Sequence, residues 1–240
     1  MKTKNVKLFL LDIGNTHTRY GLLENGKIKY SGNCDTVSLD KLAIPDDVPV
    51  AAATVVPKAK EWLKRKDVFW VNNTVKTGID LSFVDAATLG ADRIANLATL
   101  AQTANLPAII VDCGTAITIE VLDSNKVFRG GQIAPGRFLL RKSLADYTAQ
   151  LPFLPVDDIK AKTFGWNTPD AIRLGTDFGL IGAVKEFVIQ TKKELGVTDC
   201  QVFVTGGDAK ILLENIEGLV AVSADFTLLG IAAIWELNCT

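Results

Sequence analysis

Two short turns carry the residue types that bind phosphate. Asp12 and Asp112 each end an apolar run, and each is followed two residues later by a glycine, Gly14 or Gly114. Glycine lets backbone N–H groups approach an anion closely, and a carboxylate at a strand end can hold a cation that bridges phosphates. Hydroxyl and amide side chains add donors for phosphate oxygens at Asn15, Thr16 and Thr115. One such turn alone is typical of ordinary hairpins, but the matched pair favours phosphate binding from both sides.

The two turns belong to a longer repeat with an offset of 100 residues. The same offset relates Thr18 to Thr118 and Leu22 to Leu122, and Asn25 and Asn125 follow at the same spacing. Each block predicts a strand, a tight turn, a second strand, a polar turn and a third strand. Chance similarity between two hairpins is the alternative, but the run of identities favours a duplicated domain. The boundary is predicted near Leu106-Pro107, which gives halves of residues 1–106 and 107–240.

The rest of each half alternates strand and helix patterns. Strands are predicted at 50–56, 68–71 and 201–205, and helices at 58–66, 91–104, 168–195 and from 208. In the long helix, Thr168 fits the N-cap, Pro169 the first helical position and Gly196 the C-terminal stop. Residues 151–156 are predicted to be a loop. This pattern indicates an α/β protein in two halves.

A second group of candidate residues opens the helix predicted at 91–104. In the segment Gly90-Ala91-Asp92-Arg93, a carboxylate in the first turn is favoured by the helix dipole alone. The functional interpretation is that Asp92 accepts a proton from a substrate hydroxyl while Arg93 holds a substrate anion or amide. Both interpretations stay open at this point.

Two glycine-rich turns also fit either a ligand or plain chain geometry. The pair Gly206-Gly207 follows a strand and would let a flat base lie against the backbone, or it is a simple turn. The turn at 130–136 would wrap a ligand or close a domain interface. Small residues recur on the long helix, which suits either close packing within the chain or a two-fold dimer seam: Ala171, Gly175, Gly179 and Gly182. The four tryptophans are predicted to lie in the core.

Composition excludes several classes of function. Lys plus Arg number 26 against 27 for Asp plus Glu, so the net charge is −1 and no global attraction for nucleic acid or anionic lipid is expected. His17 is the single histidine, which excludes a multi-histidine metal centre. The sequence holds no P-loop, no GxGxxG fingerprint and no protein-kinase motif.

Cellular location is predicted from the cysteines and the apolar runs. None of the four cysteines forms a CxxC pair, and scattered thiols are typical of a reducing compartment. The N-terminal apolar run is too short for a signal peptide, and the longest apolar stretch, 226–235, is too short to span a membrane. We therefore expect a cytoplasmic protein without nucleic-acid or membrane partners.

Six segments in sequence order resemble one known family over nearly the whole chain. They are DIGNT at 12–16, GADRIAN at 90–96, DCGTAIT at 112–118, GGQIAPG at 130–136, NT and AI within 167–172, and TGG at 205–207. The set resembles the type III pantothenate kinases, members of the superfamily that includes acetate kinase and actin. The resemblance implies an α/β fold of two duplicated ribonuclease H-like (actin-like ATPase) halves, each a mixed β-sheet with flanking helices.

The resemblance also implies a reaction, which is ATP-dependent phosphorylation of pantothenate to 4′-phosphopantothenate, the first step of coenzyme A biosynthesis. It makes Asp92 the general base and Asp112 the ligand of a monovalent cation, K⁺ or NH₄⁺, beside the Mg²⁺ that accompanies ATP. It also implies a homodimer with substrate sites near the interface. The implied ATP-binding residues are Asp12, Ile13, Gly14, Asn15, Thr16, His17, Thr18, Arg19, Thr115, Gly206 and Gly207. The implied pantothenate-binding residues are Phe83, Gly90, Ala91, Asp92, Arg93 and Thr168.

The sequence departs from the family pattern at two positions. Phe83 stands where family members often carry tyrosine, which deletes one possible hydrogen bond worth about 1 kcal/mol, and Asn-Pro does not follow it. Arg19 stands where lysine is common.

Three other functions are alternatives to this reaction. A non-catalytic transcriptional accessory factor of the same family is expected to lose its acidic positions, yet Asp12, Asp92 and Asp112 are all present. A kinase for another small molecule, such as a sugar or acetate, is the second alternative, but the cysteine-rich zinc motif of repressor-like sugar kinases is absent. The third, an actin-like polymer subunit, is normally longer than 240 residues.

Overall fold

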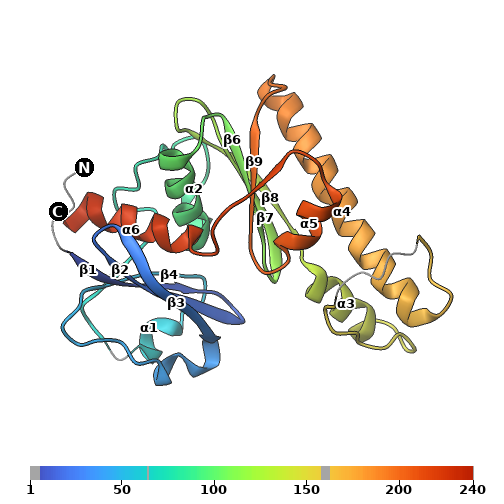
Figure 1. The fold of residues 1–240 in the computed structure, drawn as a ribbon, viewed down its shortest axis with the longest axis horizontal. Helices are drawn as coiled ribbons and strands as arrows, with labels where there is room; N and C mark the ends of the chain where they lie inside the picture. The colour runs from blue at the N-terminus through green and yellow to red at the C-terminus, as the bar shows by residue number, and fades with distance from the viewer. Residues whose placement is uncertain (1–5, 64, 158–162, 240) are drawn as a thin grey trace. The chain divides into compact units, whose positions relative to one another are not determined.

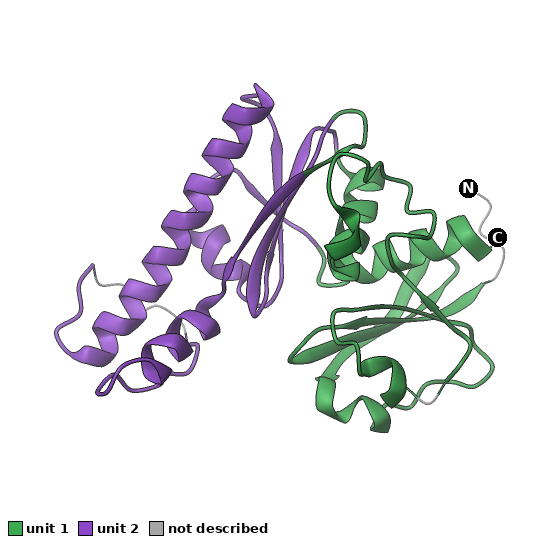
Figure 2. Cartoon of the chain, turned by 180° about the vertical axis from the view of Figure 1, so that it is seen from behind, with its two compact units in different colours: residues 1–104, 124–129, 223–240 green, residues 105–123, 130–222 purple. Residues whose placement is uncertain are grey.

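The computed structural model describes residues 6–63, 65–157 and 163–239, so the first residues of the N-terminal segment lie outside the described residues. The chain divides into two compact units (Figure 2). Unit 1 contains the described residues of 1–104, 124–129 and 223–240, and unit 2 contains those of 105–123 and 130–222. The main boundary lies beside the predicted one near 106–107, but two later segments of the chain belong to unit 1.

Unit 1 is built on a mixed five-stranded sheet in the order β3-β2-β1-β4-β5 (Figure 1). The strand β1 pairs antiparallel with β2 and parallel with β4. The apolar run of β1 alternates between the two faces, as the period of two requires. The strands are β1 (Lys7–Ile13), β2 (His17–Glu24), β3 (Lys27–Asp35), β4 (Val50–Thr54) and β5 (Val68–Trp70).

Unit 2 repeats this sheet in the order β8-β7-β6-β9-β10. Here β6 pairs antiparallel with β7 and parallel with β9, exactly the roles that β1, β2 and β4 have in unit 1. The prediction of two duplicated halves with mixed sheets is confirmed. The strands are β6 (Ala108–Cys113), β7 (Ala116–Leu122), β8 (Phe128–Pro135), β9 (Gln201–Thr205) and β10 (Leu219–Ala221).

The two hairpins differ by one residue in register, although the sequence repeat has no gap. Asp12 pairs with Arg19, whereas Asp112 pairs with Thr118. A shift of one residue turns a side chain to the other face of a sheet. Thr18 is consequently buried opposite Ile13, while Thr118 shares a face with Asp112.

Helices cover the sheets of both units. In unit 1, one face of the sheet packs on α2 and α6 through Leu8, Leu10 and their neighbours (Figure 1). The other face of the sheet packs on α1 and the short helix η1 through Phe9 and Leu11. In unit 2, β6, β7 and β9 pack on α4 and α5. The helices are η1 (Thr36–Lys41), α1 (Ala59–Trp62), η2 (Ala86–Thr88), α2 (Ala91–Thr103), α3 (Arg137–Asp146), α4 (Thr168–Leu195), α5 (Ala209–Asn215) and α6 (Phe226–Cys239).

The helix α6 belongs to unit 1 because it crosses α2 at very short range. A Cβ atom on Gly230 would overlap the carbonyl oxygen of Ala95, so only glycine permits this crossing. Two buried hydrogen bonds fix the pair, since Thr227 Oγ1 lies 2.8 Å from Asn96 Oδ1 and Thr99 Oγ1 donates to the carbonyl of Phe226 at 2.7 Å. The apolar run at 226–235 therefore completes the core of unit 1.

Two details of the sequence prediction are wrong. The N-cap of α4 is Asn167, whose side chain accepts a hydrogen bond from the backbone N–H of Asp170 at 2.8 Å, so Thr168 is already helical. Trp166 is 78% exposed and lies outside the core. At the other end of α4, Gly196 has φ +65°, which confirms the predicted glycine stop.

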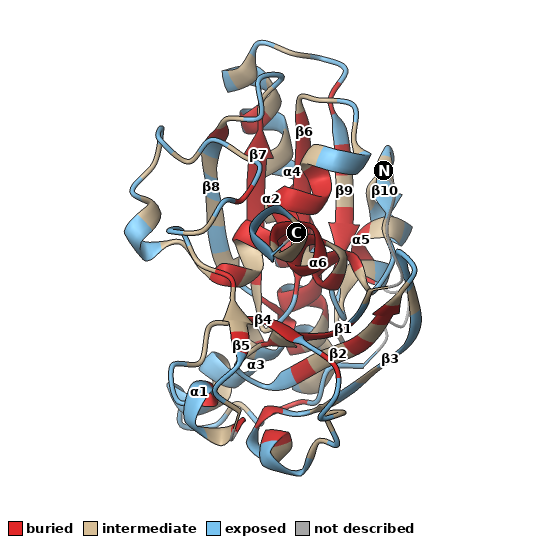
Figure 3. Cartoon of the chain, turned by 90° about the vertical axis from the view of Figure 1, so that its left-hand side faces the viewer, coloured by how far each residue is buried: buried red, intermediate tan, exposed pale blue. Residues whose placement is uncertain are grey.

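Burial is uneven across unit 2. Figure 3 shows red, buried residues on β6, β7 and β9, whereas the edge strand β8 is mostly tan and pale blue, with Phe128 as its buried first residue. Within the described ranges, no helix is long and apolar enough to cross a membrane.

Candidate active site

The β1–β2 turn of unit 1 is held in shape by the polypeptide that follows β3. The N–H of Gly14 donates to the carbonyl of His17 at 3.1 Å, and Thr36 Oγ1 donates to the carbonyl of Gly14 at 2.8 Å. The backbone N–H of Thr36 donates to Thr16 at 3.0 Å. Asn15, Thr16 and His17 are exposed at this turn. The turn thus presents polar side chains on a fixed backbone, as phosphate binding requires.

Arg19 is engaged inside unit 1. Its Nε and Nη2 atoms donate to Asp225 Oδ1 at 3.0 and 2.6 Å, and further donors reach Asn33 and Ser31. Asp225 stands directly before α6, so this ion pair ties β2 to the start of that helix. A contact between Arg19 and ATP stays a prediction.

The β6–β7 turn of unit 2 lies against two other sequence motifs. The N–H of Gly136 donates to the carbonyl of Thr115 at 3.0 Å, and a Cβ atom on Gly136 would overlap the carbonyl of Gly114. Gly206 has φ +94°, and a Cβ atom there would lie 2.5 Å from the carbonyl oxygen of Cys113. The turn at 112–115 is therefore in contact with both glycine-rich segments that the sequence singled out.

Asp112 occupies the centre of an oxygen-rich row across the sheet of unit 2. Its Cα partners are Thr118 on the antiparallel strand β7 and Thr205 on the parallel strand β9. Paired residues on neighbouring strands point to the same face, so one carboxylate and two hydroxyls lie at one level of the sheet. Oxygen donors suit hard cations such as K⁺ and Mg²⁺. Among the described residues, no group of three or more His, Cys, Asp and Glu side chains is arranged to bind a metal.

Asp92 lies in the first turn of α2 with its carboxylate folded back over the helix N-terminus. Its Oδ1 atom accepts the backbone N–H of Arg93 at 2.8 Å. A Cβ atom on Gly90, the N-cap residue, would lie 2.5 Å from that oxygen, so glycine makes room for the carboxylate. Burial raises the pKa of Asp92, and the N–H and charge of Arg93 offset only part of this rise. A carboxylate with a raised pKa is a stronger base when it is ionised.

Two arginine–aromatic contacts flank the start of α2. The guanidinium carbon of Arg129 lies 3.9 Å from the ring centroid of Phe83, and that of Arg93 lies 5.8 Å from the ring of Phe128. The backbone N–H of Asp80 donates to the carbonyl of Lys126, and the N–H of Phe128 donates to the carbonyl of Asp80. These two bonds hold the segment before Phe83 beside the start of β8. Phe83 is 57% exposed, so its ring stacks on Arg129 from an open position. Arg129 could not be predicted from the sequence because no spacing pattern marks it.

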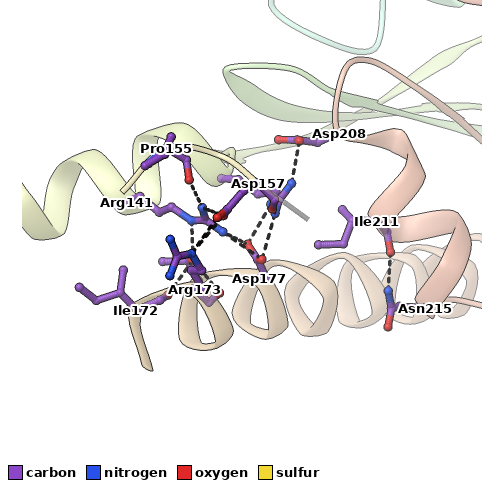
Figure 4. Close-up of polar contacts among 11 residues, drawn as sticks. Arg141, Pro155, Asp157, Ile172, Arg173, Asp177, Asp208, Ile211 and Asn215 are labelled. Carbon is purple, nitrogen blue, oxygen red and sulfur yellow. Dashed lines mark hydrogen bonds and ion pairs between the residues drawn. The ribbon is translucent and has the colours of Figure 1, made fainter. Parts of the chain in front are cut away.

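A buried cluster of charges in unit 2 was also missed. Arg137 and Arg141, one turn apart on α3, both bind Asp177 of α4, with distances from 2.8 to 3.1 Å. Arg137 also donates to Asp208, which follows Gly206-Gly207, at 3.2 Å. Figure 4 shows Arg141, Asp177 and Asp208 of this cluster. Burial lowers the pKa of Arg137, but the neighbouring Asp177 and Asp208 outweigh this effect, so its net pKa is raised. The guanidinium stays charged.

An apolar groove of about 840 Å³ runs between β8, α3 and α4 of unit 2. Thr168 is among its lining residues, together with Asn167 and Trp166. Gly175 and Gly179 line its wall, and a Cβ atom on either would meet no described atom within 4 Å. The small residues of α4 therefore border open space rather than another helix of the described chain.

The implied site residues divide between the units. Unit 1 holds 12–19, Phe83 and 90–93, and unit 2 holds Asp112, Thr115, Thr168, Gly206 and Gly207. Within unit 2, the structure brings Asp112, Thr115 and Gly206 to one end of the sheet. Convergence of both sets on one nucleotide stays a prediction.

The fold and these turns define a class of protein. A structure described as a Baf family transcriptional activator from Campylobacter jejuni superposes with a TM-score of 0.67 at 21% identity, covering 95% of this chain and 97% of that one. A structure described as a 2-dehydro-3-deoxygalactonokinase from Sinorhizobium meliloti gives 0.60 at 14% identity, with 95% and 98% covered. The chain has the duplicated ribonuclease H-like fold of actin-like ATPases and sugar kinases.

Sequence comparison narrows this class to one family. The family model for type III pantothenate kinase matches residues 8–190. A type III pantothenate kinase of Rubrobacter xylanophilus is 28% identical over 97% of this chain and 98% of its own length, and one of Dehalococcoides mccartyi is 30% identical over 97% and 98%. The chain belongs to the type III pantothenate kinase family.

Proposed function

We propose that this chain transfers the γ-phosphoryl group of ATP to the primary hydroxyl of pantothenate, giving 4′-phosphopantothenate in the first step of coenzyme A biosynthesis. The observation that carries the proposal is the family match over residues 8–190. That range retains Asp12, Asp92 and Asp112, the three acidic positions whose loss would favour a non-catalytic role.

ATP is proposed to bind through the two duplicated turns. Backbone N–H groups and hydroxyls of 12–19 and of Thr115 would surround its phosphates, and Gly206-Gly207 would lie beside the nucleotide. Phosphoryl transfer needs little covalent help from a protein, so positioning and neutralisation of charge account for most of the acceleration.

Asp92 is proposed to take the proton of the pantothenate hydroxyl as the phosphoryl group arrives. The other proposed pantothenate contacts in unit 1 are Phe83, Gly90, Ala91 and Arg93, and Thr168 contributes from unit 2. Phe83 would contact pantothenate through its ring. The guanidinium of Arg129, which stacks on that ring, places a positive charge beside these proposed contacts. Gly90 keeps the carboxylate of Asp92 free to face a substrate from the helix N-terminus.

The oxygen donors beside Asp112 fit a hard cation, and we propose that Asp112 holds the monovalent ion, K⁺ or NH₄⁺. Thr118 and Thr205 share its level on the sheet. A bound monovalent ion, with the Mg²⁺ of the nucleotide, would neutralise phosphate charge as the transfer proceeds.

The function is tested by product formation. Purified protein with ATP and Mg²⁺ is expected to release ADP with pantothenate and to form 4′-phosphopantothenate, detected by mass spectrometry, with faster turnover in K⁺ than in Na⁺. Glucose and acetate serve as control acceptors for the sugar-kinase and acetate-kinase alternatives. ADP release with glucose or acetate, and none with pantothenate, would refute the proposal.

We also propose a homodimer in which a second copy fills the groove along α4. Its lining is mainly apolar, and four large side chains beside it or on its flanking elements are exposed: Ile133, Phe138, Phe164 and Trp166. Exposed apolar surface of this kind is typical of a protein–protein interface. Two copies related by a two-fold axis would cover it on both sides.

Gly179→Leu is expected to convert the dimer to a monomer that keeps its fold. A side chain at this position starts in open space, because a Cβ atom on Gly179 would meet no described atom within 4 Å, and leucine is a better helix former than glycine. The same leucine would fill the space that a partner needs. Light scattering after size exclusion measures the mass. Lys185→Leu is the matched control, since Lys185 is exposed on the same helix, does not line the groove and lies outside the row of small residues. A dimer that persists in Gly179→Leu would contradict the assignment.

The cytoplasm is the proposed location, without nucleic-acid or membrane partners. The four cysteines are all unbridged, which suits a reducing compartment. A net charge of −1 gives no long-range attraction to polyanions.

A further inference from the structure

The N-cap residue of α3, Gly136, and its first helical residue, Arg137, contact the two nucleotide turns proposed for unit 2. Gly136 donates its N–H to Thr115 at 3.0 Å, in the turn that follows Asp112. Arg137, the next residue, extends its guanidinium to Asp208 at 3.2 Å, directly after Gly206-Gly207. One short segment of chain therefore links two loops that lie more than 90 residues apart in sequence.

The guanidinium of Arg137 is held rigidly at its other edge. Its Nε and Nη2 atoms donate to the two oxygens of Asp177 at 2.8 and 3.0 Å, and Nη2 also donates to the carbonyl of Asp157. The side chain of Arg137 is 6% exposed and that of Asp177 is fully buried. A bidentate pair in a buried setting fixes the plane of the guanidinium, and so fixes where Nη1 points.

Asp208 connects the guanidinium of Arg137 to the loop that contains Gly206-Gly207. Its backbone N–H donates to the carbonyl of Cys113 at 3.1 Å, while its carboxylate accepts from Arg137. Gly206, two residues earlier, packs directly on the carbonyl of Cys113 and sits in the left-handed region. The loop is thus fixed at its backbone by β6 and at its side chain by α3.

We propose that Arg137 is a positioning residue for nucleotide binding, which acts through Asp208 to hold Gly206-Gly207 against the turn at 112–115. The inference deepens the proposed function, because it rests on these loops being the nucleotide site. Arg137 touches no nucleotide in this scheme. Its loss should weaken ATP binding and leave pantothenate binding intact.

Arg141 offers a matched control from the same helix. It is fully buried and shares Asp177 with Arg137, through Nη2 at 3.1 Å from each oxygen. Its other contacts go to Pro155, Asp157 and Thr176, and none of its described contacts reaches Asp208 (Figure 4). A purely structural role for the cluster predicts equal effects from Arg137→Met and Arg141→Met. A positioning role predicts different ones.

The experiment measures KM for ATP, KM for pantothenate and the Kd for ADP by calorimetry. Arg137→Met is expected to raise KM for ATP and Kd for ADP about tenfold, because it removes a hydrogen bond between charged groups. KM for pantothenate should change less than about twofold, because the proposed pantothenate site does not share contacts with Arg137. Arg141→Met is expected to lower the melting temperature and to change Kd for ADP less than about twofold.

A double-mutant cycle tests whether the effect passes through Asp208. Asp208→Ala removes the oxygen that accepts from Arg137, leaves the buried Arg137–Asp177 pair intact and is expected to weaken ADP binding like Arg137→Met. The double variant should bind ADP no more weakly than Arg137→Met alone. Since Asp208→Ala keeps the buried Arg137–Asp177 pair, it also tests the inference if Arg137→Met does not fold.

Three results would overturn the inference. They are equal loss of ADP affinity in Arg141→Met and Arg137→Met, unchanged ADP affinity in Asp208→Ala, and additive effects in the double variant. Failure of the proposed function looks different, because the wild-type protein would then bind ADP without phosphorylating pantothenate. Calorimetry with ADP would still measure the role of Arg137 in that case.

Discussion

Asp92→Asn is expected to lower kcat for pantothenate phosphorylation about 10²- to 10⁴-fold, the usual contribution of a general base. Asparagine is nearly isosteric with aspartate and still accepts the N–H of Arg93, so the start of α2 should be preserved. KM for ATP should change little, because the proposed nucleotide contacts lie elsewhere. Initial rates of ADP release under saturating pantothenate measure the effect.

The pH dependence of the wild-type enzyme follows from the environment of the same carboxylate. Burial raises the pKa of Asp92 above its ordinary value, and only the ionised form accepts a proton. Activity is therefore expected to fall on acidification at a pH above the ordinary carboxyl pKa of about 3.9. The pH profile of kcat measures this limb, which should be absent from the residual activity of Asp92→Asn.

Stability should move in the opposite direction from activity. A raised pKa means that the folded state binds the proton of Asp92 more tightly than the unfolded state does. The contribution of this group to stability is present at low pH and is lost as the pH rises through the folded-state pKa. Asp92→Asn removes that loss, so the variant should melt at a higher temperature than wild type at neutral pH.

Glu61→Gln is the control for the helix-dipole interpretation of Asp92. Glu61 also lies in the first turn of a helix, α1, but is exposed. If Asp92 served the dipole of α2 alone, both variants would lose a few tenths to about 1 kcal/mol of stability and keep their activity. Full activity in Asp92→Asn would remove that residue from the mechanism.

Gly230→Ala is expected to destabilise unit 1 by about 3 kcal/mol or more, at the upper end for overpacked cores. The new methyl group would overlap the backbone carbonyl of Ala95, and a backbone atom cannot move aside as a flexible side chain can. Relief would require α6 to move away from α2, which would disturb the buried bonds from Thr227 and Thr99. Chemical denaturation followed by fluorescence measures the loss.

Gly182→Ala is the matched control for this substitution. Gly182 also lies inside a helix, but a Cβ atom there would meet no described atom within 4 Å. Alanine should stabilise α4 by about 0.5 to 1 kcal/mol, because glycine is a poor helix former. A similar small gain in Gly230→Ala would show that the α2–α6 crossing tolerates a side chain.

The duplicated sheets were predictable because the repeat fixes the same chain order twice. Apolar runs ending at Asp12 and Asp112, each with a glycine two residues on, indicate equivalent hairpins. The difference in register was not predictable. The turn between β1 and β2 is one residue longer than the turn between β6 and β7, but the two sequences align over this region without a gap. The true N-cap, Asn167, was missed because Thr168 beside it is equally suited to the position.

The charged cluster around Asp177 could not be predicted because its members have no common spacing. Arg137 and Arg141 lie 40 and 36 residues before Asp177, and only the packing of α3 on α4 unites them. The four-residue interval between the two arginines places both on one helix face, which was the single signal available. The place of α6 in unit 1 depends likewise on its packing with α2, which the linear order of the chain hides.

The return of residues 223–239 to unit 1 affects the order in which the protein can fold on the ribosome. All residues of unit 2 have been synthesised once residue 222 has left the ribosome. The apolar faces of α2 and β1 in unit 1 are covered only after α6 has also been synthesised. Domains generally fold as units during synthesis, so the part of the chain made first finishes its core last. Until then Ile94, Ala95 and Leu10 are not covered by α6. During this period the nascent chain exposes apolar surface that chaperones can bind and that promotes aggregation.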